Sequence, residues 1–149
     1  MARNRYRHNF SRHLLGVARY LQNTMMTALH QQYGHEHLRL SFSPYIILLG
    51  EGDKRLTDLA EILGISRQAC NQAAKQVVAA GYIDRIADPE DGRAKQLTLS
   101  SHGIKLRRDG LHIVAELDQQ LAQIIDGSRI LDASKSLRKI SHRHSLSLA

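Results

Sequence analysis

The segment that most constrains the fold is residues 56–80, where small residues stand at the spacing of two helices crossing at a tight turn. Ala60 is followed four residues later by Gly64, and Cys70 and Ala73 come next. A small residue lets two helices cross closely, and a glycine takes up the sharp turn between them. We therefore expect a helix-turn-helix, with Cys70 and Ala73 facing the core. Other apolar contacts of the motif are expected from Leu59, Ile62, Leu63 and Ile65.

The second helix of this motif carries one continuous polar face. Its members are Arg67, Gln68, Asn71, Gln72 and Lys75, with Ser66 as the predicted N-cap. Glutamate does not occur from residue 67 to residue 80, although ordinary surface helices often carry it. Arginine pairs with guanine edges, and asparagine and glutamine pair with adenine edges in the major groove of DNA. We interpret this face as a base-reading surface; a merely solvated helix face is the alternative.

A β-hairpin is predicted directly after the motif. Residues 82–86 and 95–99 have the pattern of two short strands, and the loop between them contains one proline and one glycine. Arg93 and Lys95 bring positive charge next to the polar helix. An arginine at the tip of such a wing can enter a narrow minor groove, where the negative potential is deepest. A plain charged turn is the alternative.

The carboxylates of the hairpin loop need a separate explanation. Asp88 and Asp91 would repel DNA phosphates unless they were paired with cations. We therefore expect Asp91 to orient Arg93 or Arg85, without a DNA contact of its own.

Helical patterns precede this module. Residues 10–33 repeat apolar side chains at steps of three and four, as one seam of a helix requires. Ser43 is predicted to cap, and Pro44 to begin, a short buried helix that runs to Leu49. The composition of residues 45–49 suits a buried strand equally well, but the Ser-Pro pair at the start favours a helix. Thr57 is predicted to cap the helix after it.

Two further helices are predicted at the carboxyl end. Ser100 begins the first, whose apolar face is predicted to comprise Ile104, Leu111, Val114, Leu117, Leu121 and Ile124. The second carries Leu131, Leu137 and Ile140. The flanking helices have more apolar surface than the small central module can cover, so we expect a second copy of the chain to cover it. An intramolecular helical cap is the alternative.

The composition fits one domain built mainly from helices. The chain has 149 residues, of which 42% are hydrophobic and 5% aromatic, and it has no tryptophan, so we expect an aliphatic core. The predicted fold class is mainly α with a small β-hairpin (α+β). We expect one domain over residues 1–149, with a winged helix-turn-helix lobe at residues 44–103 and dimerisation helices at residues 10–33 and 104–145.

The charge balance indicates a polyanionic partner. A net charge of +7 favours nucleic acid over a membrane surface, because neutralised phosphates release counterions. Simple solubility is the alternative. Cys70 is the only cysteine, which excludes an intrachain disulfide. The sequence has neither a signal-peptide pattern nor an apolar run of membrane-spanning length, so we expect a soluble cytoplasmic protein.

The order of these motifs resembles the MarR family of bacterial transcription regulators. The matching segments are residues 56–60, 64–67, 81–85, 88–93 and 97–100, the last leading to Gly103. The resemblance extends over nearly the whole chain in layout, and over residues 45–105 in recognisable motifs. It implies a homodimer joined by its N- and C-terminal helices on a pseudo-palindromic operator of double-stranded DNA. It also implies recognition helices in successive major grooves and Arg93 of each wing in a minor groove.

The resemblance further implies a signal that releases the DNA. Family members often leave DNA when a small aromatic or phenolic molecule enters a cleft between the dimerisation helices and the DNA-binding lobe, so we expect such a repressor. The residues expected to line the cleft are Leu15, Tyr20, Tyr45 and Leu49, which are equally plausible as core residues. Cys70 is expected to serve packing, because peroxide sensors of the family carry their reactive cysteine in the first helix.

Metal binding and catalysis have weaker support. Histidine pairs with ligand chemistry occur at His35 and His37 and at His142 and His144, but no third and fourth ligands stand at a clear spacing. No metal site and no cofactor are therefore predicted, and a metal-responsive regulator is an alternative. An enzyme is not expected, because a glycine-rich phosphate loop and a nucleophile elbow are missing. A non-specific architectural DNA binder and a protein-contact module are further alternatives.

Overall fold

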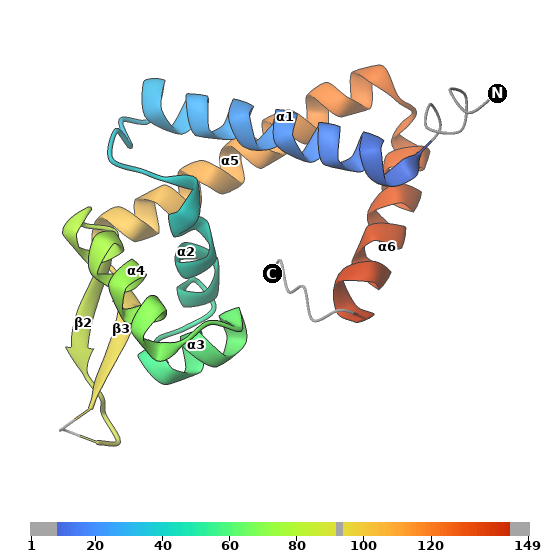
Figure 1. Cartoon of the computed structure of the whole chain (residues 1–149). Helices are drawn as coiled ribbons and strands as arrows, with labels where there is room; N and C mark the ends of the chain where they lie inside the picture. Colours follow the sequence, from blue (N-terminus) through green and yellow to red (C-terminus); the bar gives the residue numbers. More distant parts are fainter. Residues whose placement is uncertain (1–8, 92–93, 144–149) are drawn as a thin grey trace.

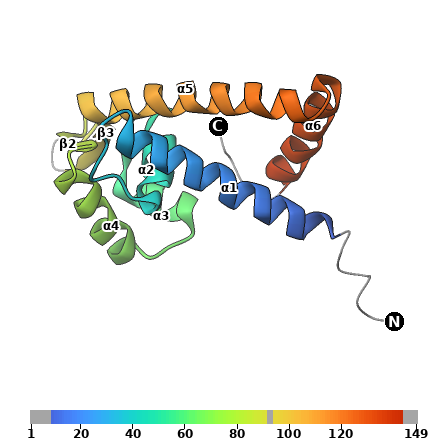
Figure 2. The ribbon, with the colours of Figure 1, turned by 90° about the horizontal axis from the view of Figure 1, so that it is seen from above.

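The computed structural model describes residues 9–91 and 94–143. Its helices are α1 Phe10–Gln31, α2 Ser43–Leu49, α3 Leu56–Leu63, α4 Arg67–Ala79, α5 Ser101–Ile124 and α6 Gly127–Arg143. A small lobe holds α2, α3, α4 and a hairpin, and the long helices α1 and α5 extend from it toward α6 (Figure 1). From above, α1 and α5 lie close together at the lobe and diverge toward the end where α6 lies (Figure 2). The predicted fold class is confirmed.

The helix-turn-helix forms as its glycines and serine predict. Gly64 ends α3 in the left-handed region, at φ +64°, which glycine adopts without a Cβ clash. Ser66 caps α4, and its hydroxyl oxygen accepts a hydrogen bond from the backbone N–H of Ala69 at 3.1 Å. Gly81, at φ +81°, then turns the chain into the hairpin.

The predicted hairpin is part of a three-stranded antiparallel sheet in the order β1-β3-β2. The strands are β1 Lys54–Arg55, β2 Ile83–Ala87 and β3 Lys95–Leu99. Arg85 of β2 pairs with Leu97 of β3, which also pairs with Lys54 of β1. The sequence did not predict β1, because two residues are too few to show an alternating pattern.

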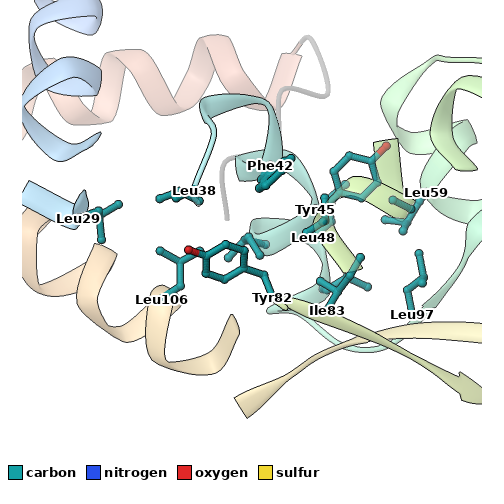
Figure 3. Packing of buried hydrophobic residues seen from close by; sticks show 14 of the residues in the cluster. Leu29, Leu38, Phe42, Tyr45, Leu48, Leu59, Tyr82, Ile83, Leu97 and Leu106 are labelled. Atoms are coloured by element: carbon teal, nitrogen blue, oxygen red, sulfur yellow. The ribbon is translucent and has the colours of Figure 1, made fainter. Parts of the chain in front are cut away.

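The core lies where the lobe meets the two long helices. Leu29 at the end of α1 and Leu106 on α5 approach Tyr82, which is fully buried (Figure 3). Leu59 of α3 and Leu97 of β3 close the opposite end of the same cluster (Figure 3). The core therefore joins the lobe to α1 and α5.

Within the helix-turn-helix, the predicted core residues need correction. Cys70 is fully buried as expected, but its fully buried partner is Ala74, and Ala73 is only partly buried. Ile62 and Ile65 do not pack inside and are 55% and 41% exposed. The helical repeat of 3.6 residues places position 74 on the same side as position 70.

Two predicted helix caps are wrong. A 3₁₀ turn, Leu40–Phe42, leads directly into α2, and the Ser43 hydroxyl donates to the carbonyl oxygen of Leu40 instead of capping the helix. Thr57 lies inside the first turn of α3, where its hydroxyl donates to Asp58 Oδ1 at 3.1 Å. Strand β1 runs straight into α3, so Arg55 occupies the N-cap position.

The apolar residues of α5 divide between two sides of the helix. Leu106, Ile113 and Leu117 are buried inside the chain. The predicted face is instead largely exposed, since Ile104, Leu111, Val114 and Ile124 are between 44% and 78% exposed. Leu117 alone belongs to both sets. Among the described residues, no helix is long and apolar enough to cross a membrane.

Candidate nucleic-acid interface

The polar residues predicted on α4 lie on one outward side of the lobe. The exposed members are Ser66, Arg67, Gln68, Gln72 and Lys75, and Asn71 is half-buried. The opposite side of α4 is buried through Cys70, Ala74 and Val77. Because this apolar side fixes the rotation of the helix, the side chains with hydrogen-bonding groups must face away from the core.

A hydrogen bond ties α4 to the hairpin strand β2. Arg85 Nη2 donates to Asn71 Oδ1 at 2.9 Å. Arg85 shares the sheet face of Ile83, because side chains two residues apart point the same way, and Ile83 is fully buried. Sequence reasoning gave Arg85 only as one of two possible partners of Asp91, since it did not bring β2 and α4 together.

Asp88 organises the base of the wing loop. Its side chain is almost fully buried and accepts a charged hydrogen bond from Arg55 Nε of β1. Its other oxygen accepts from the backbone N–H groups of Glu90, at 2.9 Å, and Asp91, at 3.3 Å. The Arg55 guanidinium, followed by the Glu90 N–H, holds the pKa of the Asp88 carboxyl well below its usual range. The wing is therefore fastened to β1 through a carboxylate that sequence reasoning left without a role.

Replacing Asp88 with alanine is expected to loosen the wing loop without unfolding the lobe. The amides of Glu90 and Asp91 lose their acceptor, so their hydrogen exchange should accelerate on the order of tenfold. Asp84→Ala removes the same charge from an exposed position of β2 and is the matched control. Equal exchange rates in wild type and Asp88→Ala would show that the carboxylate does not hold the loop.

The other predicted wing residues lie near the end of the hairpin. Lys95 is exposed at the start of β3. Asp91 is exposed, and its carbonyl oxygen accepts from Ala94 N–H at 2.8 Å. Arg93, and with it the prediction that Asp91 orients Arg93, lies outside the described residues.

The four predicted effector-pocket residues do not line one site within a single chain. Leu15 and Tyr20 are 71% and 57% exposed on α1, whereas Tyr45 and Leu49 are buried in α2. The Tyr45 hydroxyl donates to the carbonyl oxygen of Cys70 at 3.3 Å, and burial raises its pKa. Tyr45 is therefore a core residue of the lobe.

An open groove lies where α5 leaves the lobe. Its volume is about 520 Å³. The walls include Leu49 of α2, Leu99 of β3 and Leu111 of α5, together with the basic side chains Arg107 and Arg108. The groove thus combines apolar walls with guanidinium groups.

The histidines of the 35–37 segment point in different directions. His35 is fully buried, with Nε2 at 2.9 Å from Asp109 Oδ2, and His37 is exposed. Among the described residues, no group of three or more potential ligands is placed to hold a metal ion. The side chains of His142 and His144 lie outside the described part of the chain.

His35 and Asp109 are the buried members of a polar cluster at the junction of the lobe and α5. Lys105 donates both to Asp109 at 2.5 Å and to the carbonyl oxygen of Tyr33 at 3.1 Å. The rings of Tyr82 and His102 stack with centroids 4.6 Å apart. Sequence reasoning missed this cluster, although a lysine and an aspartate four residues apart on one helix are a usable signal for an ion pair.

A model of the MarR family matches residues 45–94, from α2 to the wing loop. The resemblance to the MarR family is confirmed. No curated protein sequence matches the chain.

Several solved structures share this fold over nearly the whole chain. The transcriptional regulator Tm0710 of Thermotoga maritima is 23% identical, with a TM-score of 0.65 over 93% of this chain and 97% of that one. A MarR transcriptional regulator of Methanosarcina mazei Go1 is also 23% identical, with a TM-score of 0.69 over 93% and 97%. A point mutant of S. aureus MepR, solved bound to an oligodeoxyribonucleotide, is 18% identical, with a TM-score of 0.56 over 93% and 99%. These similarities extend the MarR-type fold to the long helices.

Proposed function

We propose that the chain is a sequence-specific DNA-binding transcription regulator. The observation that carries the proposal is the outward, glutamate-free polar face of α4, which lies next to a hairpin with Lys95 exposed. This face offers the donors and acceptors that read base edges in the major groove. The net charge of +7 and the likeness to MepR, which was solved with an oligodeoxyribonucleotide, add support.

A homodimer is part of this proposal. The long helices leave apolar side chains exposed: Phe10, Leu15, Val17 and Tyr20 on α1, Ile104, Leu111, Val114 and Ile124 on α5, and Leu131 and Ile140 on α6. Apolar exposure of this extent marks an interaction surface. A two-fold dimer would present two copies of α4 to successive major grooves, so the preferred double-stranded site should be a pseudo-palindrome.

The regulator is further proposed to be a repressor that a small aromatic or phenolic effector releases. The groove beside α5 supports this step, because apolar walls with a few polar groups suit such ligands. Of the four residues predicted for the pocket, Leu49 lines this groove. A bound molecule there would touch both α5 and the lobe that carries α4. Titrating benzoate and phenol derivatives against the protein–DNA complex tests this step.

Selection of genomic DNA with the purified protein, followed by footprinting, tests the central proposal. The expected result is enrichment of one sequence class and a footprint with two-fold symmetry. An architectural binder would protect DNA without sequence preference, and a protein-contact module would retain no DNA. Either result would overturn the proposal.

Gln68→Ala is expected to relax base preference at one position of each half-site. A good side-chain contact to a base edge contributes about 1–3 kcal/mol of discrimination, and that contribution should be lost. Gln76→Ala is the matched control, because Gln76 is exposed on the same helix but lines a groove with Glu36 and His37. Competition binding with single-base operator variants measures the effect. If Gln68→Ala keeps full preference, the reading face lies elsewhere.

A further inference from the structure

The bond between Arg85 and Asn71 determines which end of the Asn71 amide is free. A guanidinium has only hydrogen-bond donors, so the amide atom that faces it must be the carbonyl oxygen. The contact is indeed from Arg85 Nη2 to Asn71 Oδ1, at 2.9 Å. The amide nitrogen, with its two N–H donors, is left as the free end of this half-exposed side chain.

This orientation changes what Asn71 can read. Asparagine recognises adenine with both ends of its amide, because the oxygen accepts from adenine N6 and the nitrogen donates to N7. Here one lone pair of the oxygen already accepts from the charged Arg85 guanidinium, which makes the oxygen a weaker acceptor for a second donor such as adenine N6. The remaining donors of both side chains match an edge made of acceptors, and guanine presents two, N7 and O6, in the major groove.

We propose that Arg85 and Asn71 act as one donor-only reading unit, which selects guanine over adenine at the base that faces Asn71. Arg85 is thereby a specificity-determining residue supplied by the wing strand. The inference rests on the proposed function, and it reverses the adenine preference that asparagine alone would suggest.

The fold places the side chains of Asn71 and Arg85 next to each other. Asn71 follows the fully buried Cys70 on α4, and Arg85 lies two residues after the fully buried Ile83 on β2. Strand β2 runs beside α4 in the lobe (Figure 1). Both backbones are fixed by these core neighbours, so the pair is set before any DNA arrives. Rotating the amide to read adenine requires breaking the bond to a charged donor, which we expect to cost on the order of tenfold in affinity.

The test uses the full chain and the operator found by genomic selection. All single-base variants of one half-site are measured by competition, and the base facing Asn71 is the position at which Asn71→Ala loses discrimination. Wild type is expected to prefer guanine over adenine there by about tenfold. Arg85→Met should remove or reverse this preference. Arg39→Met removes the same charge from an exposed position of the lobe and should leave the preference intact.

Three outcomes would overturn the inference. Wild type could prefer adenine at the Asn71-dependent position, which would show that both ends of the amide are used. Arg85→Met could weaken guanine and adenine sites equally, as the loss of a plain phosphate contact does. Failure of wild type to select any sequence would overturn the proposed function itself, and this result differs from the other two. Thermal unfolding of each variant shows that the compared proteins are folded.

Discussion

Replacing Gly103 with alanine is expected to lower the free energy of unfolding by about 3 kcal/mol or more. A Cβ atom at this position would stand 2.0 Å from the carbonyl oxygen of Tyr82 and 3.2 Å from Leu99 Cδ2. The Tyr82 carbonyl oxygen cannot yield cheaply, because it accepts a hydrogen bond from Ser100 N–H at 3.1 Å. The substitution must therefore move α5 away from the start of β2.

Gly110→Ala is the matched control for this prediction. Gly110 lies on the same helix, and a Cβ there would meet no atom within 4 Å. Alanine is the better helix former by about 1 kcal/mol, so Gly110→Ala should stabilise the protein slightly. Urea unfolding at one fixed protein concentration measures both changes, which should have opposite signs. A stabilising effect of Gly103→Ala would show that α5 and β2 are not in close contact.

The junction at Gly103 connects the lobe to α5. Ser100 caps α5 by accepting from the Gly103 N–H at 3.0 Å, and it donates to the carbonyl oxygen of Gly81 at 2.6 Å. Gly81 follows α4, so the Ser100 hydroxyl links the segment after α4 to the first turn of α5. A substitution that tilts α5 should therefore also shift the carboxyl end of α4, because Ser100 is bonded to both segments.

Much of the fold could be predicted because its signals are local. Gly64 and Ser66 mark the turn and the cap of α4 within a few residues, and the hairpin follows from two strand patterns with a proline and a glycine between them. Strand β1 has no such signal, since it exists only through its pairing with β3. The Ser43 cap failed for a similar reason, because a 3₁₀ turn precedes the helix and satisfies the serine.

The sequence predicted the parts of the candidate site that lie within one helix, but not the contacts between different elements. The outward face of α4 follows from helical periodicity, and its five polar residues lie on one side as predicted. The bonds that orient this face and the wing join distant segments, as Arg85 does with Asn71 and Arg55 with Asp88. No spacing rule relates such partners. The sequence predicted a paired carboxylate in the wing at Asp91, and the structure adds a second one, Asp88, which is paired with Arg55.

Acidification from pH 7 to pH 5 is expected to destabilise the protein, with His35 as a principal cause. Burial lowers the pKa of His35, the hydrogen bond to Asp109 opposes this effect, and the nearby charges of Lys105 and His102 lower the pKa further. Nε2 carries the proton that Asp109 accepts at 2.9 Å, so a second proton would have to bind Nδ1. Within the described residues, Nδ1 has no hydrogen-bond acceptor. The folded protein therefore resists protonation at this ring.

The unfolded chain has no such resistance and takes up the proton near pH 6.5. Below that pH the unfolded state binds more protons than the folded state, so the free energy of unfolding falls as the pH falls. One group of this kind contributes at most about 1.4 kcal/mol per pH unit, or about 2 kcal/mol by pH 5. The lowered pKa of Asp109 adds a loss in the same direction at still lower pH.

His35→Gln separates this contribution from that of the other histidines. Glutamine keeps an N–H donor for Asp109 and does not titrate, so the variant should show a shallower pH dependence of stability than wild type. His37→Gln removes an exposed imidazole from the same loop and should keep the steeper profile. Urea unfolding between pH 5 and pH 8 provides the measurement, and equal slopes for wild type and His35→Gln would contradict the assignment.

The His35 cluster connects the loop after α1, helix α5 and the residue before β2. Loss of stability in this cluster should therefore also weaken DNA binding at low pH, and more so in wild type than in His35→Gln.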